Sequence, residues 1–473
     1  MFRKLDKSRF LLLAAILIAS VFRLYRISDY MEFLGDQGRD VVIIRDFLKN
    51  GNLFFIGPQT SIGNIYLGPY YYYLISPALF IANYSPVGPA VFVALVSILT
   101  VYLLYIVGKK WFNPQVGLIS AFLYAISPVV IKYSNFSWNP NIMPLFSLLF
   151  ICFMVESKYL QASLAFIMCL NSHYLALLLL PVGLIIWLKN QNKKGSLVAI
   201  FVFILSLTPQ ILFDLKHQGQ NINAIIHFFT YRETTVNIKA YKAIPKLFPL
   251  FNQVNTRLLA GKNTLPGTLI SLYLIISLVL IYYQKKHSPH LTVLGFWYLI
   301  GILGLGLYKQ HVYDHYFGFL FPSVFLLFAY SISYLSSAHK LGKFISIAVF
   351  TISVVFSFYE NPLRYVPNRQ LAITQQIVDS IIQESAGKPF NLALLAKQNY
   401  DPPYRYLFYL LKSPLRNTHL EITDQLFVVC EPWQIDCQPI NHPQWEIASF
   451  GWAKIINTWE ISGIKIFKLV HND

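Results

Sequence analysis

The residues best suited to chemistry lie near the N-terminus, in the segment Gly35 to Asp40. A carboxylate such as Asp36 can accept a proton from a nucleophile, and an arginine such as Arg39 can hold a phosphate through paired hydrogen bonds. The structural alternative is that Asp36 is the N-cap of a helix, with Arg39 and Asp40 solvated around it. The next residues, Val41 to Leu48, have the apolar spacing of a helix that lies on a membrane surface.

Histidines and tyrosines form two further groups at the ends of apolar stretches. His173 follows one such stretch, and His311, Tyr313 and His315 lie together between two others. Imidazole and phenol groups in these positions suit polar contacts to a phosphate. The alternative is an interfacial role, because a histidine at the end of a membrane span often serves only as a hydrogen-bonding residue.

A metal site is a further hypothesis for the second group. If residues 309–316 were helical, His311 and His315 would share one face beside Asp314. Imidazole and carboxylate ligands at that spacing, with Asp36 as an additional ligand, could bind a divalent ion. The sequence implies no other cofactor.

The chain that must position these residues is a membrane protein by composition. Of its 473 residues, 55% are hydrophobic and 12% are charged, and its mean hydropathy is +0.50, which soluble proteins of this size do not usually show. A net charge of +17 would suggest nucleic-acid binding in a soluble protein. In a membrane protein it indicates basic cytoplasmic loops, so we expect the lipid bilayer, and no nucleic acid, as a partner.

Eleven apolar stretches are predicted to cross the bilayer, which requires roughly 18 residues in each helix. They are 10–27, 88–108, 115–131, 141–156, 159–172, 174–188, 196–213, 265–284, 291–308, 315–335 and 342–359. Basic clusters between them should all face the cytoplasm. These clusters are Arg3/Lys4/Lys7/Arg9, Lys109/Lys110, Lys189/Lys193/Lys194, Lys285/Lys286 and Lys340/Lys343. The prediction is a multi-pass protein of the cell membrane with a cytoplasmic N-terminus.

A further apolar stretch, Tyr66 to Ala82, would reverse the sidedness of everything after it if it crossed. We interpret it as a juxtamembrane or re-entrant segment at the outer interface. Its tyrosines, including Tyr70 and Tyr71, suit that depth because their rings can be buried while their hydroxyls stay wet. Residues 28–87 and 214–264 then form outer loops.

The chain after the last span is predicted to be a small extracytoplasmic α/β domain, residues 360–473, accessory to a transmembrane domain, residues 1–359. Segments of helical and β-branched character support this prediction; they are 370–384, 392–396, 425–430 and 464–469. Cys430 and Cys437 lie in this domain, where an oxidising compartment and their spacing permit a disulfide. Free thiols are the alternative.

The first outer loop resembles that of the GT-C membrane glycosyltransferases, in the branch that holds protein O-mannosyltransferases and lipid A aminoarabinose transferases. Asp36 and Arg39 match the aspartate and arginine of that family's acidic motif, and Gln37 stands where the family has glutamate. The segment Gly68 to Tyr72 matches a later Pro-Leu-Tyr-Tyr motif, without the lysine that often precedes it. The resemblance covers about the first third of the chain and continues through Tyr105 to Pro128.

This resemblance implies a GT-C-like fold and transfer of a hexose or pentose from a polyprenyl-phosphate donor to an extracytoplasmic acceptor, which is an envelope glycan, a lipid or a protein. In an inverting step Asp36 would be the catalytic base. Arg39, Arg45, Arg232 or Arg257 would supply positive charge to the departing phosphate. Further substrate contacts would come from Asp40, Tyr70, Tyr71, His173, His311, Tyr313 and His315.

Two other functions remain open at this point. A transporter or lipid flippase would also need many spans, but it predicts ionisable residues at mid-membrane depth or paired broken helices. A polymerase or ligase of surface polysaccharide would have a large outer loop rich in Arg and His late in the chain. The spans are nearly free of Asp and Glu, and the late loop is short, so the glycosyltransferase is the preferred hypothesis.

Overall fold

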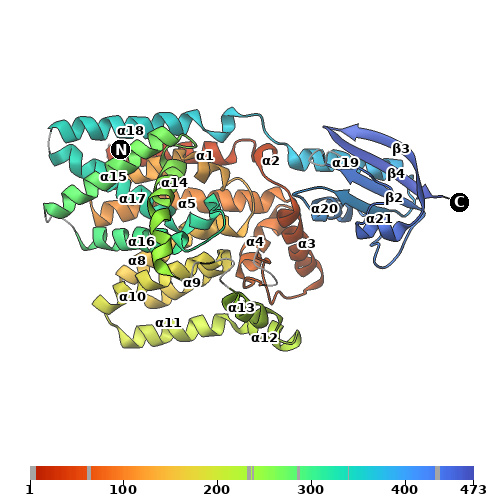
Figure 1. Cartoon of the computed structure of the whole chain (residues 1–473), viewed down its shortest axis with the longest axis horizontal. Helices are drawn as coiled ribbons and strands as arrows, with labels where there is room; N and C mark the ends of the chain where they lie inside the picture. The colour runs from red at the N-terminus through yellow and green to blue at the C-terminus, as the bar shows by residue number, and fades with distance from the viewer. Residues whose placement is uncertain are drawn as a thin grey trace, which may run out of the picture. The chain divides into compact units, whose positions relative to one another are not determined.

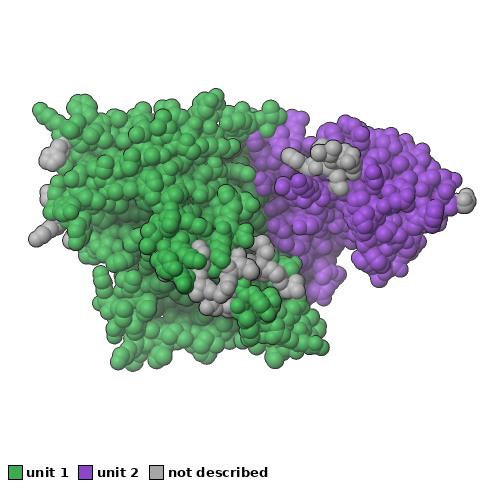
Figure 2. Space-filling view, viewed as in Figure 1, with its two compact units in different colours: residues 1–25, 53–75, 90–366 green, residues 26–52, 76–89, 367–473 purple. Residues whose placement is uncertain are grey.

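The computed structural model describes residues 7–60, 65–231, 236, 239–284, 288–338, 340–431 and 437–472. Most of the chain is helical, and a four-stranded sheet lies near the C-terminus (Figure 1). The chain forms two compact units (Figure 2): unit 1 comprises residues 1–25, 53–75 and 90–366, and unit 2 comprises residues 26–52, 76–89 and 367–473. Arg3, Lys4, Arg232, Lys285 and Lys286 lie outside the described residues.

Unit 1 is a helical bundle, and each predicted span coincides with helical structure. Its α-helices, including those that begin or end at the unit boundary, are α1 Lys7–Leu24, α4 Tyr70–Ile81, α5 Val87–Trp111, α6 Pro114–Ile126, α7 Pro128–Lys132, α8 Met143–Val155, α9 Tyr159–Ser172, α10 Leu179–Lys189, α11 Lys193–Ser206, α12 Thr208–Lys216, α13 Gln220–Thr230, α14 Ile244–Leu259, α15 Thr264–Tyr283, α16 Pro289–Gly306, α17 Phe321–Ala338 and α18 Lys340–Tyr359. Short 3₁₀ helices are η1 Asn139–Ile142, η2 Tyr174–Leu178, η4 Ala240–Ala243, η5 Asp314–Leu320 and η6 Pro362–Arg364.

Six of the described helices are long and apolar enough to cross a membrane by length and composition. They are Val87–Trp111, Lys193–Lys216, Thr264–Tyr283, Pro289–Gly306, Asp314–Ala338 and Lys340–Tyr359. Shorter apolar helices occupy other predicted spans, such as Tyr159–Ser172. The helical membrane-protein class is therefore confirmed, while the number of eleven crossings stays a prediction.

Several helix starts follow directly from local sequence. The side chain of Asn113 accepts a hydrogen bond from Val116 N, and Pro114 occupies the first helical position of α6. Ser288 and Pro289 begin α16 in the same way. Helix α4 is different, because its 12 residues span only about 18 Å at 1.5 Å per residue. This length is short of a bilayer core, but the predicted span α9 has only 14 residues, so the interpretation that Tyr66 to Ala82 does not cross stays a prediction.

A buried arginine joins three helices of unit 1. Arg23 on α1 is 1% exposed; its Nε donates to Ser97 Oγ on α5 at 2.9 Å. Its terminal nitrogens donate to the carbonyls of Ala125 and Tyr124 at 2.8 and 3.1 Å. These carbonyls close α6 and carry the negative end of its dipole, so the buried cation is compensated without a carboxylate.

Unit 2 contains a mixed sheet covered on both faces. Its strands are β1 Asn391–Leu395, β2 Gln425–Cys430, β3 Ala453–Ile461 and β4 Ile464–His471, in the order β1-β2-β4-β3. β1 pairs with β2 in parallel, and the other pairs are antiparallel. Its helices are α2 Ile27–Tyr30, α3 Gly35–Asn50, α19 Gln370–Glu384, α20 Pro402–Leu410 and α21 Trp445–Phe450.

The alternation of side chains along β2 explains this arrangement. Leu426 and Val428 share a core cluster with Phe450 of α21. Phe427 points to the opposite face of the sheet, where its ring contacts Phe390 and Trp459. The predicted helix 370–384 and the predicted strands are confirmed, and a disulfide joins Cys430 to Cys437 as expected.

The structure groups the acidic segment 26–52 with the tail, since α3 packs against α20 and α2 packs against α19. The division into a transmembrane domain, 1–359, and an accessory domain, 360–473, stays a proposal about the membrane boundary.

Candidate active site

The acidic motif forms the first turn of α3. Leu34 is the N-cap and Gly35 begins the helix, so the interpretation of Asp36 as the N-cap is wrong. The side chain of Gln37 accepts a hydrogen bond from Leu34 N at 3.0 Å, which satisfies one N–H group at the helix start. The side chain of Asp36 is not the acceptor of this hydrogen bond, and it is 41% exposed.

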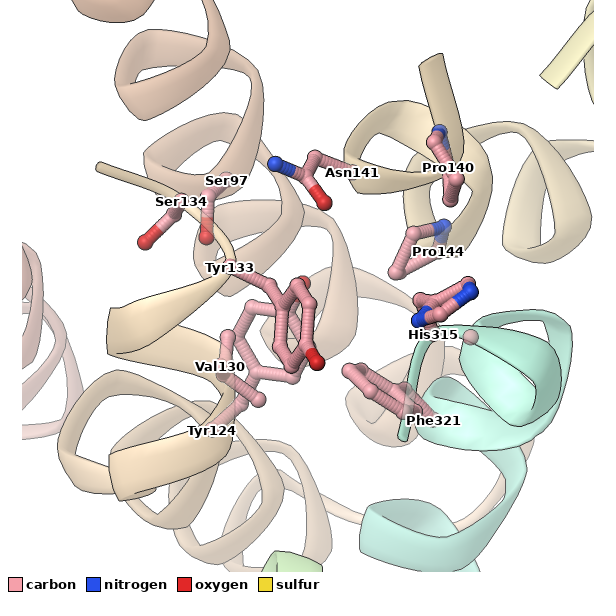
Figure 3. A pocket seen from close by; sticks show the side chains of 11 residues that line it. Ser97, Tyr124, Val130, Tyr133, Ser134, Pro140, Asn141, Pro144, His315 and Phe321 are labelled. Atoms are coloured by element: carbon pink, nitrogen blue, oxygen red, sulfur yellow. The ribbon is translucent and has the colours of Figure 1, made fainter. Parts of the chain in front are cut away.

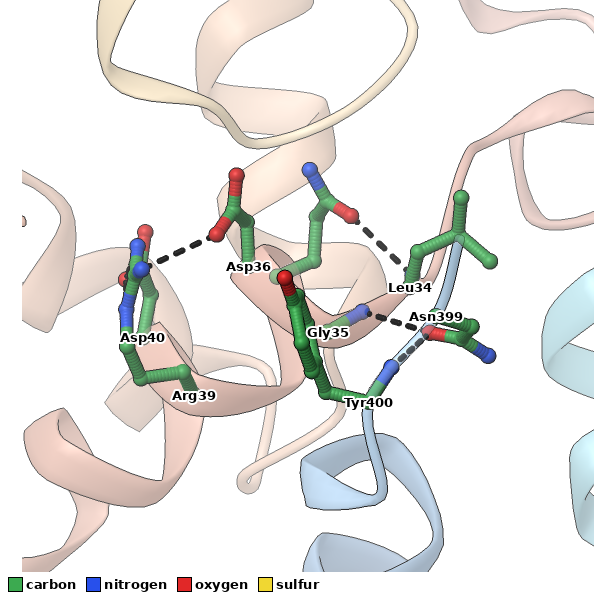
Figure 4. Close-up of polar contacts among 8 residues, drawn as sticks. Leu34, Gly35, Asp36, Arg39, Asp40, Asn399 and Tyr400 are labelled. Atoms are coloured by element: carbon green, nitrogen blue, oxygen red, sulfur yellow. Dashed lines mark hydrogen bonds and ion pairs between the residues drawn. The ribbon is translucent and has the colours of Figure 1, made fainter. Parts of the chain in front are cut away.

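Arg39 lies between the two carboxylates (Figure 4). One terminal nitrogen is 2.9 Å from Asp36 Oδ1, and the other is 2.7 Å from Asp40 Oδ1. Asp40 is 1% exposed, whereas the side chain of Asp36 is 41% exposed. A buried carboxylate requires such a charged partner. The geometry assigns Asp40 to fixing Arg39 and leaves Asp36 accessible to a substrate.

Glycines bring the tail close to this turn. A Cβ atom on Gly35 would lie 2.5 Å from Tyr400 Cδ2, and one on Gly38 would lie 2.3 Å from the backbone nitrogen of Pro403. Real atoms do not approach so closely, so these two positions of α3 exclude side chains. The requirement for glycine follows from contact with residues 400–403, which sequence spacing alone could not show.

The other candidate arginines have identifiable neighbours. Arg45 on α3 lies over the ring of Tyr409, 5.8 Å from its centroid. Arg257 on α14 forms an ion pair with Asp314, with Nε 2.8 Å from Oδ1. This contact with Asp314 raises the pKa of Arg257, so the residue stays cationic.

The two candidate tyrosines begin α4. The hydroxyl of Tyr71 is 2.8 Å from Ser137 Oγ, and Tyr71 is fully buried. Tyr70 is partly buried, and its hydroxyl donates to the carbonyl of Ser206 at 2.9 Å. Both hydroxyls thus make contacts within unit 1, and their substrate contacts stay a prediction.

The predicted histidines and Tyr313 converge on an aromatic–histidine cluster in unit 1, which we define as Tyr133, Trp138, His173, His311, Tyr313, His315 and Tyr316. The ring of His315 lies 4.5 Å from Trp138, 5.8 Å from Tyr313 and 6.1 Å from His173, measured between centroids. His311 contacts Tyr313 at the edge of the cluster. Sequence reasoning did not select Tyr133 and Trp138 as site residues. The only signal for them was the high aromatic content of residues 133–138.

His173 is held as a neutral side chain. Its Nδ1 accepts a hydrogen bond from Leu175 N at 3.1 Å, so this nitrogen carries no proton. Burial lowers the pKa of His173 to about 4 because the charged form is poorly solvated. At neutral pH the residue therefore offers one N–H donor, at Nε2, and no positive charge.

The cluster borders a small pocket lined by both apolar and polar side chains (Figure 3). Lining residues include Ser97, Tyr124, Tyr133, Asn141 and His315. Asn141 Oδ1 and His315 Nδ1 are buried and have no hydrogen-bond partner within the described part of the chain. Buried polar atoms are rarely left in this state, so these two groups are suited to bind a polar ligand or water.

The metal hypothesis receives no support from this geometry. Residues 309–313 are not helical, and η5 begins only at Asp314, so His311 and His315 do not share an α-helical face. Asp314 is engaged by Arg257. Among the residues that the structure describes, no group of three or more His, Cys, Asp or Glu side chains could hold a metal ion, and this includes Asp36.

Comparison with known proteins identifies the fold. No protein-family model and no curated protein matches the sequence. The structure of ArnT from Cupriavidus metallidurans bound to undecaprenyl phosphate matches with a TM-score of 0.60 and 10% identity, over 97% of each chain. The apo form of that protein matches with a TM-score of 0.61. The archaeal oligosaccharyltransferase AglB from Archaeoglobus fulgidus, in complex with an inhibitory peptide and a dolichol-phosphate, gives 0.51 at 11% identity, over 90% of this chain and 69% of that chain.

The chain has the GT-C fold. The expectation drawn from the first outer loop is thereby confirmed at the level of the fold, and it extends over nearly the whole chain instead of its first third. At identities of 10 to 11% the likeness establishes the GT-C fold alone.

Proposed function

We propose that this GT-C protein transfers a sugar from a polyprenyl-phosphate donor to an extracytoplasmic acceptor in one inverting step. The observation that carries the proposal is the exposed Asp36 carboxylate, held by Arg39 on the first turn of α3. The solved structures with the same fold support the class of donor, since they contain undecaprenyl phosphate and dolichol-phosphate.

The proposed step balances as follows. An acceptor hydroxyl or amine attacks the anomeric carbon and forms the new glycosidic bond, while the bond from that carbon to the phosphate oxygen breaks. Asp36 takes the acceptor's proton, and polyprenyl phosphate leaves with the bonding electrons. Arg39 or another of the arginines balances the charge that develops on the departing phosphate.

We assign binding of the donor to the aromatic–histidine cluster. The flat faces of Trp138 and Tyr133 suit the C–H face of a sugar ring. The Nε2–H of His173 could donate a hydrogen bond to a hydroxyl of the sugar, and the side-chain oxygen Oδ1 of Asn141 could accept one. His311, Tyr313 and His315 would contribute further polar contacts. Tyr71, next to Tyr70 at the start of α4, would help to position the loop around Ser137. Such a combination of apolar faces with few polar groups is typical of small-molecule sites.

The proposed sidedness follows from the basic clusters: the N-terminus is cytoplasmic, and residues 360–473 are extracytoplasmic. A transporter or flippase is the second candidate. Arg23 gives it no support, because this buried charge is bound by Ser97 and by carbonyls of α1 and α6 and has a structural role.

The test is turnover of purified protein in lipid nanodiscs with a panel of polyprenyl-phosphate sugars. We expect one donor to release polyprenyl phosphate together with a glycosylated acceptor, and Asp36→Asn to lose this activity. Absence of release from every donor, together with movement of a donor between the leaflets of proteoliposomes, would instead establish the transporter.

A further inference from the structure

A partly buried amide–carboxylate pair, Asn399 and Glu431, connects the tail to the first turn of α3 within unit 2. Asn399 Oδ1 accepts hydrogen bonds from Gly35 N and Tyr400 N, each at 2.9 Å (Figure 4). Asn399 Nδ2 donates to Glu431 Oε1 at 2.7 Å, and the hydroxyl of Tyr404 donates to the same oxygen at 3.2 Å. Glu431 is 8% exposed. The pair has no role in the chemistry described above.

We infer that Asn399 and Glu431 are positioning residues that fix the first turn of α3 and, through it, the carboxylate of Asp36. The N–H groups of a first helical turn have no partner within the helix, and the N-cap Leu34 offers no side-chain oxygen. Asn399 supplies that oxygen from the tail. The inference rests on the proposed role of Asp36 as the base.

Glu431 determines which end of the Asn399 amide faces the helix. The two ends of an amide have nearly the same shape, but one accepts and the other donates. A carboxylate only accepts, so Glu431 turns the NH₂ group toward itself and the oxygen toward Gly35. The reverse orientation would set the NH₂ group against the N–H of Gly35 and leave both donors unpaired.

Because α3 contacts residues 400–403, the position of its first turn depends on the hydrogen bond from Gly35 N to Asn399 Oδ1. Gly35 and Gly38 approach Tyr400 and Pro403 without room for a Cβ atom, so a shift of Asn399 has to move the helix start. Asp36 is the next residue after Gly35. A misplacement of about 1 Å can reduce turnover about 100-fold.

The test exchanges the amide of Asn399 and the carboxylate of Glu431 between the two positions. Asn399→Asp sets two carboxylates against each other, and we expect kcat to fall about 10-fold to 100-fold while the KM for the donor stays near that of the parent. In the double variant Asn399→Asp/Glu431→Gln, the new carboxylate accepts from Gly35 N and from the new amide, so kcat should return to near the parent value. Glu421→Gln is the matched control, because Glu421 is an exposed tail carboxylate paired with Arg416.

Hydrogen exchange of the peptide that covers residues 33–41 gives a second readout that needs no activity. We expect faster exchange there in Asn399→Asp, parent-like exchange in the double variant, and no change in peptides covering β1 and β2. Parent-like exchange or parent-like kcat in Asn399→Asp would overturn the inference, as would a double variant no better than the single one. If the parent transfers no sugar, the proposed function fails, and exchange at residues 33–41 alone decides whether Asn399 and Glu431 fix this turn.

Discussion

Arg39 donates to Asp36 across 2.9 Å, within a single turn of helix. This pair places a carboxylate that could accept a proton next to a guanidinium that could bind a phosphate, one helical turn apart. Asp36 is 41% exposed and Arg39 is 28% exposed, so both can meet a substrate. Arg39 also contacts the carboxylate of Asp40, which is buried and fixes the orientation of the guanidinium.

The first prediction concerns Asp36. Asp36→Asn preserves shape and removes the proton acceptor, so donor binding should persist while kcat falls by roughly 10²–10⁴. Transfer rates and donor affinity of the purified variant check this expectation. Near-parental transfer by Asp36→Asn would refute the assignment of the base.

Asp40→Asn tests the second carboxylate that Arg39 contacts. We expect it to lower the stability of unit 2, because the change leaves Arg39 without its enclosed ionic partner. At a temperature where the variant is folded, kcat should fall less than in Asp36→Asn. A loss of kcat in Asp40→Asn as large as that expected for Asp36→Asn, with Asp36→Asn active, would move the base to Asp40.

The second prediction concerns sidedness. An impermeant thiol reagent applied to intact cells should label Lys388→Cys in the tail and should not label Lys110→Cys at the end of α5. Both positions are exposed, so labelling reports access from outside. The opposite pattern would overturn the orientation that the basic clusters predict.

The sequence predicted the elements of this fold better than it predicted their contacts. Apolar length indicated helical structure in each predicted span, and β-branched segments indicated β2 over Gln425–Cys430, because both signals are local. The family motif indicated Asp36 and Arg39 as a pair. It could not indicate that Leu34 is the N-cap, with its N–H bound by the side chain of Gln37.

The residues that sequence reasoning missed are joined over long distances along the chain. Asn399 reaches Gly35 across 364 residues, and Trp138 meets His315 through the packing of η1 on η5. No spacing rule connects such positions. The assumption of an α-helix at residues 309–316 was wrong for a related reason, since the chain turns into a 3₁₀ helix only at Asp314.

The third prediction concerns the aromatic–histidine cluster. If Trp138 packs against the donor sugar, Trp138→Ala should raise the KM for the donor about tenfold, equivalent to about 1.4 kcal/mol of lost contact. Trp138→Phe keeps an aromatic face and should stay close to the parent. Equal KM values for all three proteins would exclude Trp138 from the donor site.

The fourth prediction concerns the pH dependence of unit 2. Burial raises the pKa of Glu431, and the hydrogen bonds from Asn399 and Tyr404 offset this only in part. A carboxyl group whose pKa is higher in the folded state binds its proton more tightly there, so its contribution to stability is fully present below its unfolded pKa of about 4.3. That contribution is lost as pH rises from this value through the raised folded pKa. Differential scanning fluorimetry should therefore show that Glu431→Gln gains stability relative to the parent as pH is raised from 4 to 7. The exposed control Glu421→Gln should show no such gain, and a Glu431→Gln difference that is constant with pH would contradict the assignment of the titration to Glu431.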